Sequence, residues 1–101
     1  MNASYEATLQ VNNEYIDLSP FPEQFLARTV AGAVSSLRGA EDIRSIELYL
    51  ERGDVRIFAN GDELLLTPFP NDIIANTMVG LVSSLKGVDR IDSLNISVTV
   101  T

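Results

Sequence analysis

The sequence contains a long internal similarity. The segment SPFPEQFLARTVAGAVSSLRGAEDIRS, which begins at Ser19, aligns without a gap on TPFPNDIIANTMVGLVSSLKGVDRIDS, which begins at Thr67, at a constant offset of 48 residues. Over residues 19–53, 13 of 35 positions are identical, and most of the others exchange similar side chains. Self-similarity at a fixed period indicates a repeated structural unit. The pattern predicts a tandem duplication with repeats at about 5–52 and 53–101, and the many differences between the copies argue against a simple designed tandem.

The length and composition favour one domain over residues 1–101. With 101 residues, 46% of them hydrophobic, the chain can bury one core, whereas each repeat alone would be marginal. Cysteine and histidine are both absent. Their absence removes the usual zinc ligands, the commonest nucleophile and the commonest general base. We therefore expect no metal, no cofactor and no catalytic residues.

The charge of the chain argues against nucleic-acid binding. A net charge of −7 repels phosphate backbones, and no basic stripe is visible. No apolar stretch approaches the ~20 residues that a membrane helix requires. The N-terminal segment also lacks the basic start and apolar run of a signal peptide. The sequence predicts a cytoplasmic protein with no nucleic-acid or membrane partner.

Each repeat shows the pattern strand, turn, strand, helix, strand. Asparagine followed by asparagine or glycine, at 12–13 and 60–61, favours tight hairpin turns. Apolar residues recur at helical spacing over 22–37 and 70–85, and they alternate with polar residues at 45–51 and 93–100. The first two strands of each repeat are expected at Tyr5–Val11, Tyr15–Leu18, Val55–Ala59 and Glu63–Leu66.

These elements predict an α+β fold of two tandem ββαβ repeats, written as ββαββαβ and counted as six strands and two helices. The repeats are expected to share one core about a pseudo-two-fold axis. The resulting architecture is a two-layer sandwich, in which both helices cover one face of a mixed six-stranded sheet.

A second stripe on each predicted helix combines small and polar residues. Glycine inside a helix is about 1 kcal/mol less favourable than alanine, so a glycine in the middle of both helices requires a reason. We expect close helix–helix packing along this stripe, either within the chain or with a second chain. The candidate interface residues on the stripe are Thr29, Gly32, Ser36, Thr77, Gly80 and Ser84.

Other motifs have structural interpretations. The prolines of the two PFP segments, residues 20–22 and 68–70, are expected to stiffen the corner before each helix, with the phenylalanine folded onto the first turn as a hydrophobic staple. The paired serines at 35–36 and 83–84 are interpreted as polar residues at helix ends. The acidic groups Glu41–Asp42, Asp62–Glu63 and Asp89 with Asp92 lie at predicted turns or helix-to-strand loops and are expected to be solvated.

The string TPFPNDIIANTMVGLVSSLKGVDRIDSLNI resembles a group of short, uncharacterised prokaryotic proteins. Those proteins have one copy of a hairpin, an NPF corner and a helix that ends in VSSLKGV. The present chain differs from them in its two copies and in the second proline after the phenylalanine. The resemblance implies that single-copy relatives form dimers, which this chain mimics internally, and it implies no activity or site residues.

The function that the sequence favours is a non-enzymatic protein-interaction or assembly module, with a homodimer or a different protein as partner. Besides the helix stripe, the final strand is a candidate interface because its polar face carries no charge. An edge strand without charge or proline is prone to pairing with another chain. The candidate residues on this strand are Asn95, Ser97 and Thr99.

The alternative is a small anionic ligand, or a simple enzyme site, in the groove between the repeats. A pseudo-two-fold axis would place Thr29 near Thr77 and Arg28 near Asn76. Basic residues near the helix ends would then bind the anion. These are Arg28, Arg38, Arg44, Lys86 and Arg90.

Overall fold

The computed structural model describes residues 4–37 and 42–101 of the chain. Their elements are β1 (Tyr5–Val11), β2 (Glu14–Ile16), α1 (Pro20–Ser35), β3 (Ser45–Glu51), β4 (Asp54–Ala59), β5 (Asp62–Leu64), α2 (Pro68–Ser83) and β6 (Ser93–Val100). The fold is α+β, as predicted. The order is ββαβββαβ, so the expected string ββαββαβ was one strand short.

The six strands form a single sheet in the order β2-β1-β6-β3-β4-β5. Every neighbouring pair is antiparallel, so the expectation of a mixed sheet was wrong. The reason lies in the position of β6. Strands β1 and β3 run in the same direction, because both are antiparallel to β6, and would form a parallel pair if they were adjacent. Strand β6 separates them.

The strand order is symmetric about the central β3–β6 pair. Strand β1 from the first half of the chain pairs along its whole length with β6 from the second half, with Tyr5 opposite Val100 and Val11 opposite Leu94. Strand β4 from the second half pairs in the same way with β3 from the first, from Ile46 opposite Ala59 to Glu51 opposite Asp54. Each half therefore completes the sheet of the other.

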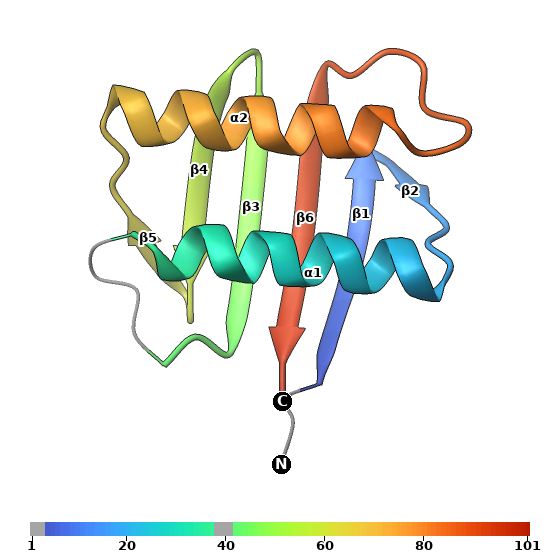
Figure 1. Ribbon diagram of the computed structural model, residues 1–101. Coiled ribbons are helices and arrows are strands. Elements are labelled where there is room, and N and C mark those ends of the chain that lie inside the picture. Colours follow the sequence, from blue (N-terminus) through green and yellow to red (C-terminus); the bar gives the residue numbers. More distant parts are fainter. Residues whose placement is uncertain (1–3, 38–41) are drawn as a thin grey trace.

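Both helices lie on one face of the sheet and run across its strands (Figure 1). Alternate residues of the four long strands point towards the helices and form the core with one side of each helix. The fully buried large side chains are Leu9, Leu26, Val30, Val34, Ile46, Leu48, Ile57, Met78, Val82, Ile96 and Val98. The opposite face of the sheet has no layer covering it among the described residues.

Both helices begin two residues earlier than the periodicity predicted. Helix α1 starts at Pro20 and α2 at Pro68, with Ser19 and Thr67 as the preceding caps in extended conformation. Proline is compatible with the first helical turn, where its missing N–H has no partner to lose. The PFP segments are thus the first turns of the helices and not corners before them.

The helices end at their paired serines, as expected for polar residues at helix termini. The Ser36 hydroxyl donates to the carbonyl of Ala33 at 2.6 Å. In the second helix, Ser83 and Ser84 donate to the carbonyl of Gly80 at 3.0 and 3.1 Å. These hydroxyls donate to carbonyl groups of the last helical turn, and the Ala33 carbonyl also accepts the backbone N–H of Ser36. Residues Arg38 and Glu41 lie outside the described part of the chain.

Each helix also binds the outer edge of the sheet. Strand β2 pairs only with residues 9–11 of β1, which leaves the outward N–H of Ala7 without a strand partner. The Glu23 carboxylate accepts this hydrogen bond at 3.0 Å. At the equivalent place in the second half, Asn71 accepts from the N–H of Val55 at 2.8 Å. The same backbone group is satisfied in both halves, by two different side chains.

Candidate functional site

The described part of the chain gives no sign of metal or membrane chemistry. Within residues 4–37 and 42–101, no group of three or more acidic side chains converges in a way that could hold a metal ion. Neither of the two described helices is long and apolar enough to cross a membrane.

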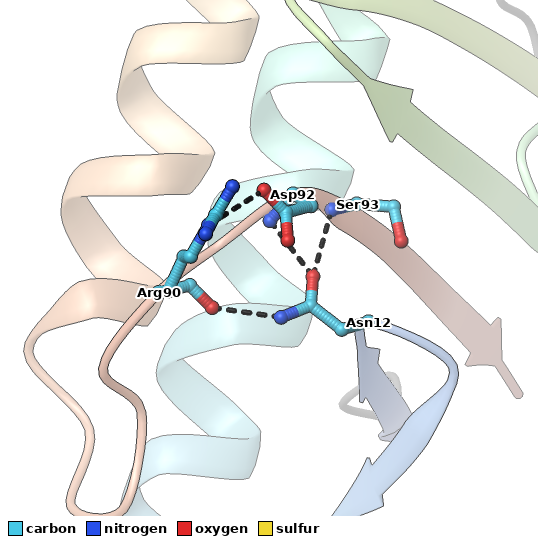
Figure 2. A network of polar contacts seen from close by, with 4 residues as sticks. All are labelled: Asn12, Arg90, Asp92 and Ser93. Carbon is cyan, nitrogen blue, oxygen red and sulfur yellow. Dashed lines mark hydrogen bonds and ion pairs between the residues drawn. The ribbon is translucent and has the colours of Figure 1, made fainter.

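Polar contacts join the two halves at the ends of the central strands. The side chain of Asn12 accepts hydrogen bonds from the backbone N–H groups of Asp92 and Ser93 at 2.7 and 3.0 Å, and it donates to the carbonyl of Arg90 at 2.8 Å (Figure 2). Arg90 in turn forms an ion pair with Asp92. We call this arrangement an asparagine clamp.

A second asparagine clamp occurs at the other end of the sheet. The Asn60 side chain accepts from the N–H groups of Arg44 and Ser45 at 2.7 and 3.1 Å, and it donates to the carbonyl of Asp42 at 2.9 Å. Asn60 lies 48 residues after Asn12, so the two clamps occupy matching positions in the chain. Each clamp fixes the loop before the closing strand of the other half.

The geometry separates the basic residues of the expected anion site. Arg44 precedes β3 and Arg90 precedes β6, and these antiparallel strands begin at opposite ends of their pair. Arg28 lies over the ring of Tyr5, with its guanidinium carbon 4.6 Å from the ring centroid. The described arginines therefore do not converge on one groove between the halves.

The outer side of the helices carries most of the exposed large apolar side chains. Phe21 and Phe69 are each 74% exposed, although they occupy the first turns of their helices. Phe25 and Ile73, one turn later, are 52% and 51% exposed. Phe21 contacts Phe25 with ring centroids 5.9 Å apart. The staple interpretation was therefore wrong, because Phe21 is part of the first helical turn and its side chain is exposed to solvent.

The small residues of the predicted stripe lie on the same outer side. We call this surface the helix face, and it consists of Phe21, Phe25, Thr29, Gly32, Ser36, Phe69, Ile73, Thr77, Val79, Gly80 and Ser84. A Cβ atom added at Gly32 or Gly80 would meet no atom of residues 4–37 and 42–101 within 4 Å. The expected crossing of the two helices through these glycines within the chain is therefore wrong. The space beside both glycines is open.

A shallow groove runs between the end of α1 and the beginning of α2. It has a volume of about 370 Å³. Its lining includes Ala33, Ser36, Leu37, Phe69, Ile73 and Thr77. The groove shows that the helices do not close tightly on each other at this place, so apolar surface between them remains accessible.

The helix face is poor in charge. Only Glu23, Arg28 and Asp72 among the charged residues of the chain lie within the helices. Taking ~200 Å² for a free phenylalanine, the exposed apolar side chains of the helix face present roughly 500 Å². This value is in the range of the largest apolar patch on a typical monomer, which is often functional.

Several exposed positions of the helix face are identical in the two halves, whereas most positions on the uncovered face of the sheet differ. On the helices, phenylalanine, threonine, glycine and serine recur at 21 and 69, 29 and 77, 32 and 80, and 36 and 84. On the uncovered face of the sheet, Gln10 corresponds to Phe58 and Tyr49 to Ser97. The agreement on the helices concerns residues that the core does not require.

The final strand occupies the centre of the sheet. Strand β6 pairs with β1 on one side and with β3 on the other. The expectation that Asn95, Ser97 and Thr99 belong to an unpaired edge strand was therefore wrong. Their side chains lie on the uncovered face, where the absence of charge no longer signals an open edge.

The sequence interpretation missed two features of these surfaces. It assigned the phenylalanines of the PFP segments to packing, although proline at the first helical position places the next residue on a helix and not before it. It also passed over Tyr49 and Phe58, two aromatic residues at the polar positions of alternating strands. That position was the signal for an aromatic pair on the uncovered face.

Comparison of the chain with protein-family models, curated proteins and solved structures found no significant match.

Proposed function

We propose that this chain is a non-enzymatic assembly module whose helix face pairs with the helix face of a second copy. The observation that carries the proposal is the agreement between the two halves at exposed helix positions. These positions combine apolar side chains with small residues and almost no charge, and the internal core does not account for them.

The matching positions favour a second copy as the partner. A two-fold dimer interface brings the same surface of both subunits together, so the surface must be complementary to itself. Helices α1 and α2 run in opposite directions across the sheet (Figure 1). The N-terminal aromatic turns therefore lie at opposite ends of the helix layer. At each end of this layer, the aromatic turn of one helix lies beside the C-terminal part of the other helix, which carries the glycine and serine residues.

Charge supports the same pairing. Two copies with a net charge of −7 each repel one another over most of their surfaces. The helix face carries little of that charge, and its two exposed charged neighbours, Arg28 and Asp72, have opposite signs. Two copies therefore approach most easily through their helices.

The open space at Gly32 and Gly80 provides a reason for glycine in both helices. The distance between packed helices depends on the side chains at the contact, and small residues allow the closest approach. An incoming phenylalanine of a second copy finds room beside these glycines. A standard interface buries about 800 Å² per partner, to which roughly 500 Å² of exposed apolar side chain contributes the larger part.

The test is the solution mass of the chain by light scattering during size exclusion at increasing concentrations. We expect the mass to rise from 11.0 kDa towards twice that value. The double variant Phe21→Lys/Phe69→Lys should remain a monomer. The matched control Tyr15→Lys/Leu65→Lys changes residues that are 72% and 92% exposed away from the helices, and it should dimerise like the native chain. A native monomer at all concentrations, or equal loss in the control, overturns the proposal.

A further inference from the structure

The uncovered face of the sheet carries a groove that the proposed dimer leaves free. The groove lies across β1, β6, β3 and β4 and has a volume of about 660 Å³. Its aromatic wall is the pair Tyr49 and Phe58, whose rings meet edge to face with centroids 6.1 Å apart. Gln10 and Asn95 add amide groups to the lining, directly opposite each other on neighbouring strands.

The uncovered face is strongly acidic. Strand alternation and register place five carboxylates and one guanidinium on it, a net charge of −4 within the −7 of the chain. These residues are Glu6, Glu47, Glu51, Asp54, Glu63 and Arg56. Most of the excess negative charge of the protein therefore faces away from the helices.

The single arginine of this face is already engaged. Its Nε donates to Glu63 at 3.0 Å and its Nη2 to the same carboxylate at 3.2 Å. The guanidinium carbon of Arg56 lies 5.3 Å from the centroid of the Phe58 ring. Arg56 is thus unavailable to neutralise the other acids of the groove.

Two of those acids face each other, and neither forms an ion pair with a described residue. Glu51 and Asp54 are directly opposite partners at the end of the β3–β4 hairpin, and both line the groove. Like charges in this relation destabilise a sheet. The ion pairs found in the described part of the chain, Arg56–Glu63 and Arg90–Asp92, include neither of them. A positive group placed here relieves their repulsion.

The same groove offers an aromatic platform and an unsatisfied acceptor. Tyr49 precedes Glu51 by two residues on the same face of β3 and is 40% exposed, so a cation can lie over its ring. The Oδ1 atom of Asn95, directly opposite Tyr49, is buried and has no hydrogen-bond donor among the described residues. A peptide N–H group that reached this buried oxygen, after the atoms covering it moved aside, would donate the missing hydrogen bond.

We propose that this groove binds a basic, extended peptide. A lysine or arginine side chain lies over Tyr49 between Glu51 and Asp54, and peptide N–H groups donate to the amide oxygens of Asn95 and Gln10. Charge complementarity selects a basic partner, because a nucleic acid would meet the acidic face with like charge. The site belongs to one copy of the chain, so this proposal does not depend on the helix-face dimer.

The test uses a blocked octapeptide of alternating arginine and glycine, with the glutamate–glycine peptide as the negative probe. Binding is measured by tyrosine fluorescence and by amide chemical shifts at 150 mM salt. We expect the basic peptide to shift amides of the groove. The double variant Glu51→Gln/Asp54→Asn should weaken binding by about tenfold or more, because it removes both nearby charges. Tyr49→Thr should weaken it by about threefold to tenfold through loss of the ring.

The control is Asp17→Asn/Asp89→Asn, which changes the net charge equally at exposed residues outside the groove. It should weaken binding by less than about twofold, because screening at this salt limits distant charges. Equal weakening in the control shows attraction to the whole protein and overturns the proposal. Absence of binding by the native chain also overturns it. Circular dichroism of each variant verifies that the loss reflects binding and not unfolding.

Discussion

Asn12, in the turn between β1 and β2, accepts a hydrogen bond from the backbone N–H of Ser93 at 3.0 Å, across 81 residues of the chain. The strand that Ser93 begins then pairs with the strand that Asn12 follows. Asn60 makes the corresponding contact with Ser45. Both clamps join one half of the chain to the other. The long strands also pair between the halves, so neither half contains a complete sheet.

The asparagine clamps should contribute measurably to stability. Asn12→Gly removes three side-chain hydrogen bonds but keeps the positive φ of 52° accessible. We expect a loss of about 1–3 kcal/mol in the free energy of unfolding by urea. Asn13→Gly is the matched control, because Asn13 also has a positive φ and the second half has glycine at this position. Equal losses in both variants would refute the role of the clamp.

The helix glycines should be replaceable by alanine in the monomer. A Cβ at Gly32 or Gly80 meets no described atom within 4 Å, so the higher helix propensity of alanine decides the effect. We expect each substitution to stabilise the monomer by about 0.5–1 kcal/mol in urea unfolding at low protein concentration. Gly53→Ala provides the contrast, because its φ of +84° strains alanine and should lower stability. Destabilisation by either helix substitution would contradict the open space beside these glycines.

The ion pair Arg56–Glu63 should make the stability of the folded chain depend on pH. The hydrogen bond from Arg56 lowers the pKa of Glu63 below its ordinary value of 4.5. A lowered folded-state pKa contributes stability above the unfolded-state pKa, and this contribution is lost as the pH falls through the folded-state pKa. In Glu63→Gln, the decline of stability from pH 5 downwards should be shallower than in the native chain. A steeper decline in urea unfolding across this range would contradict the assignment. The effect is small because both side chains are exposed.

Replacing Asn95 by an apolar residue should raise the stability of the chain and weaken its binding of the basic peptide. Replacement by valine removes a buried acceptor that has no donor within the described chain, and it places a β-branched residue in the central strand. We expect Asn95→Val to raise the unfolding free energy by about 1 kcal/mol more than Ser97→Val, which changes the same strand and face without removing an unsatisfied atom. The variant should also bind the basic peptide more weakly. A destabilised Asn95→Val would show that the amide is satisfied in the folded chain.

The elements of the fold were predictable from sequence because their signals are local. Alternation gave the closing strands, and helical spacing identified both helices within two residues at each end. The starts of the helices shifted because proline belongs to the first helical turn in both halves. Periodicity alone does not indicate that preference, since the two prolines and the phenylalanine at 20–22 fit a corner equally well.

Strand order and surface roles were not predictable in the same way, because they depend on pairing between distant segments. The uncharged polar face of residues 93–100 was interpreted as an unguarded edge. In the structure, β6 is paired on both sides and needs no charge to prevent further pairing. Likewise, the glycines indicated close packing, but only the three-dimensional arrangement showed that no described element fills the space beside them.

The absence of cysteine allows the central claim to be tested directly by crosslinking. Thr29→Cys places a single thiol on the helix face, and Ser97→Cys places one on the uncovered face of the sheet. Each variant is treated with a short bismaleimide and the crosslinked fraction is measured by gel electrophoresis over a range of concentrations. We predict efficient formation of a crosslinked dimer by Thr29→Cys and little by Ser97→Cys. Equal crosslinking of the two variants, or preferential crosslinking through Ser97→Cys, would contradict assembly through the helices.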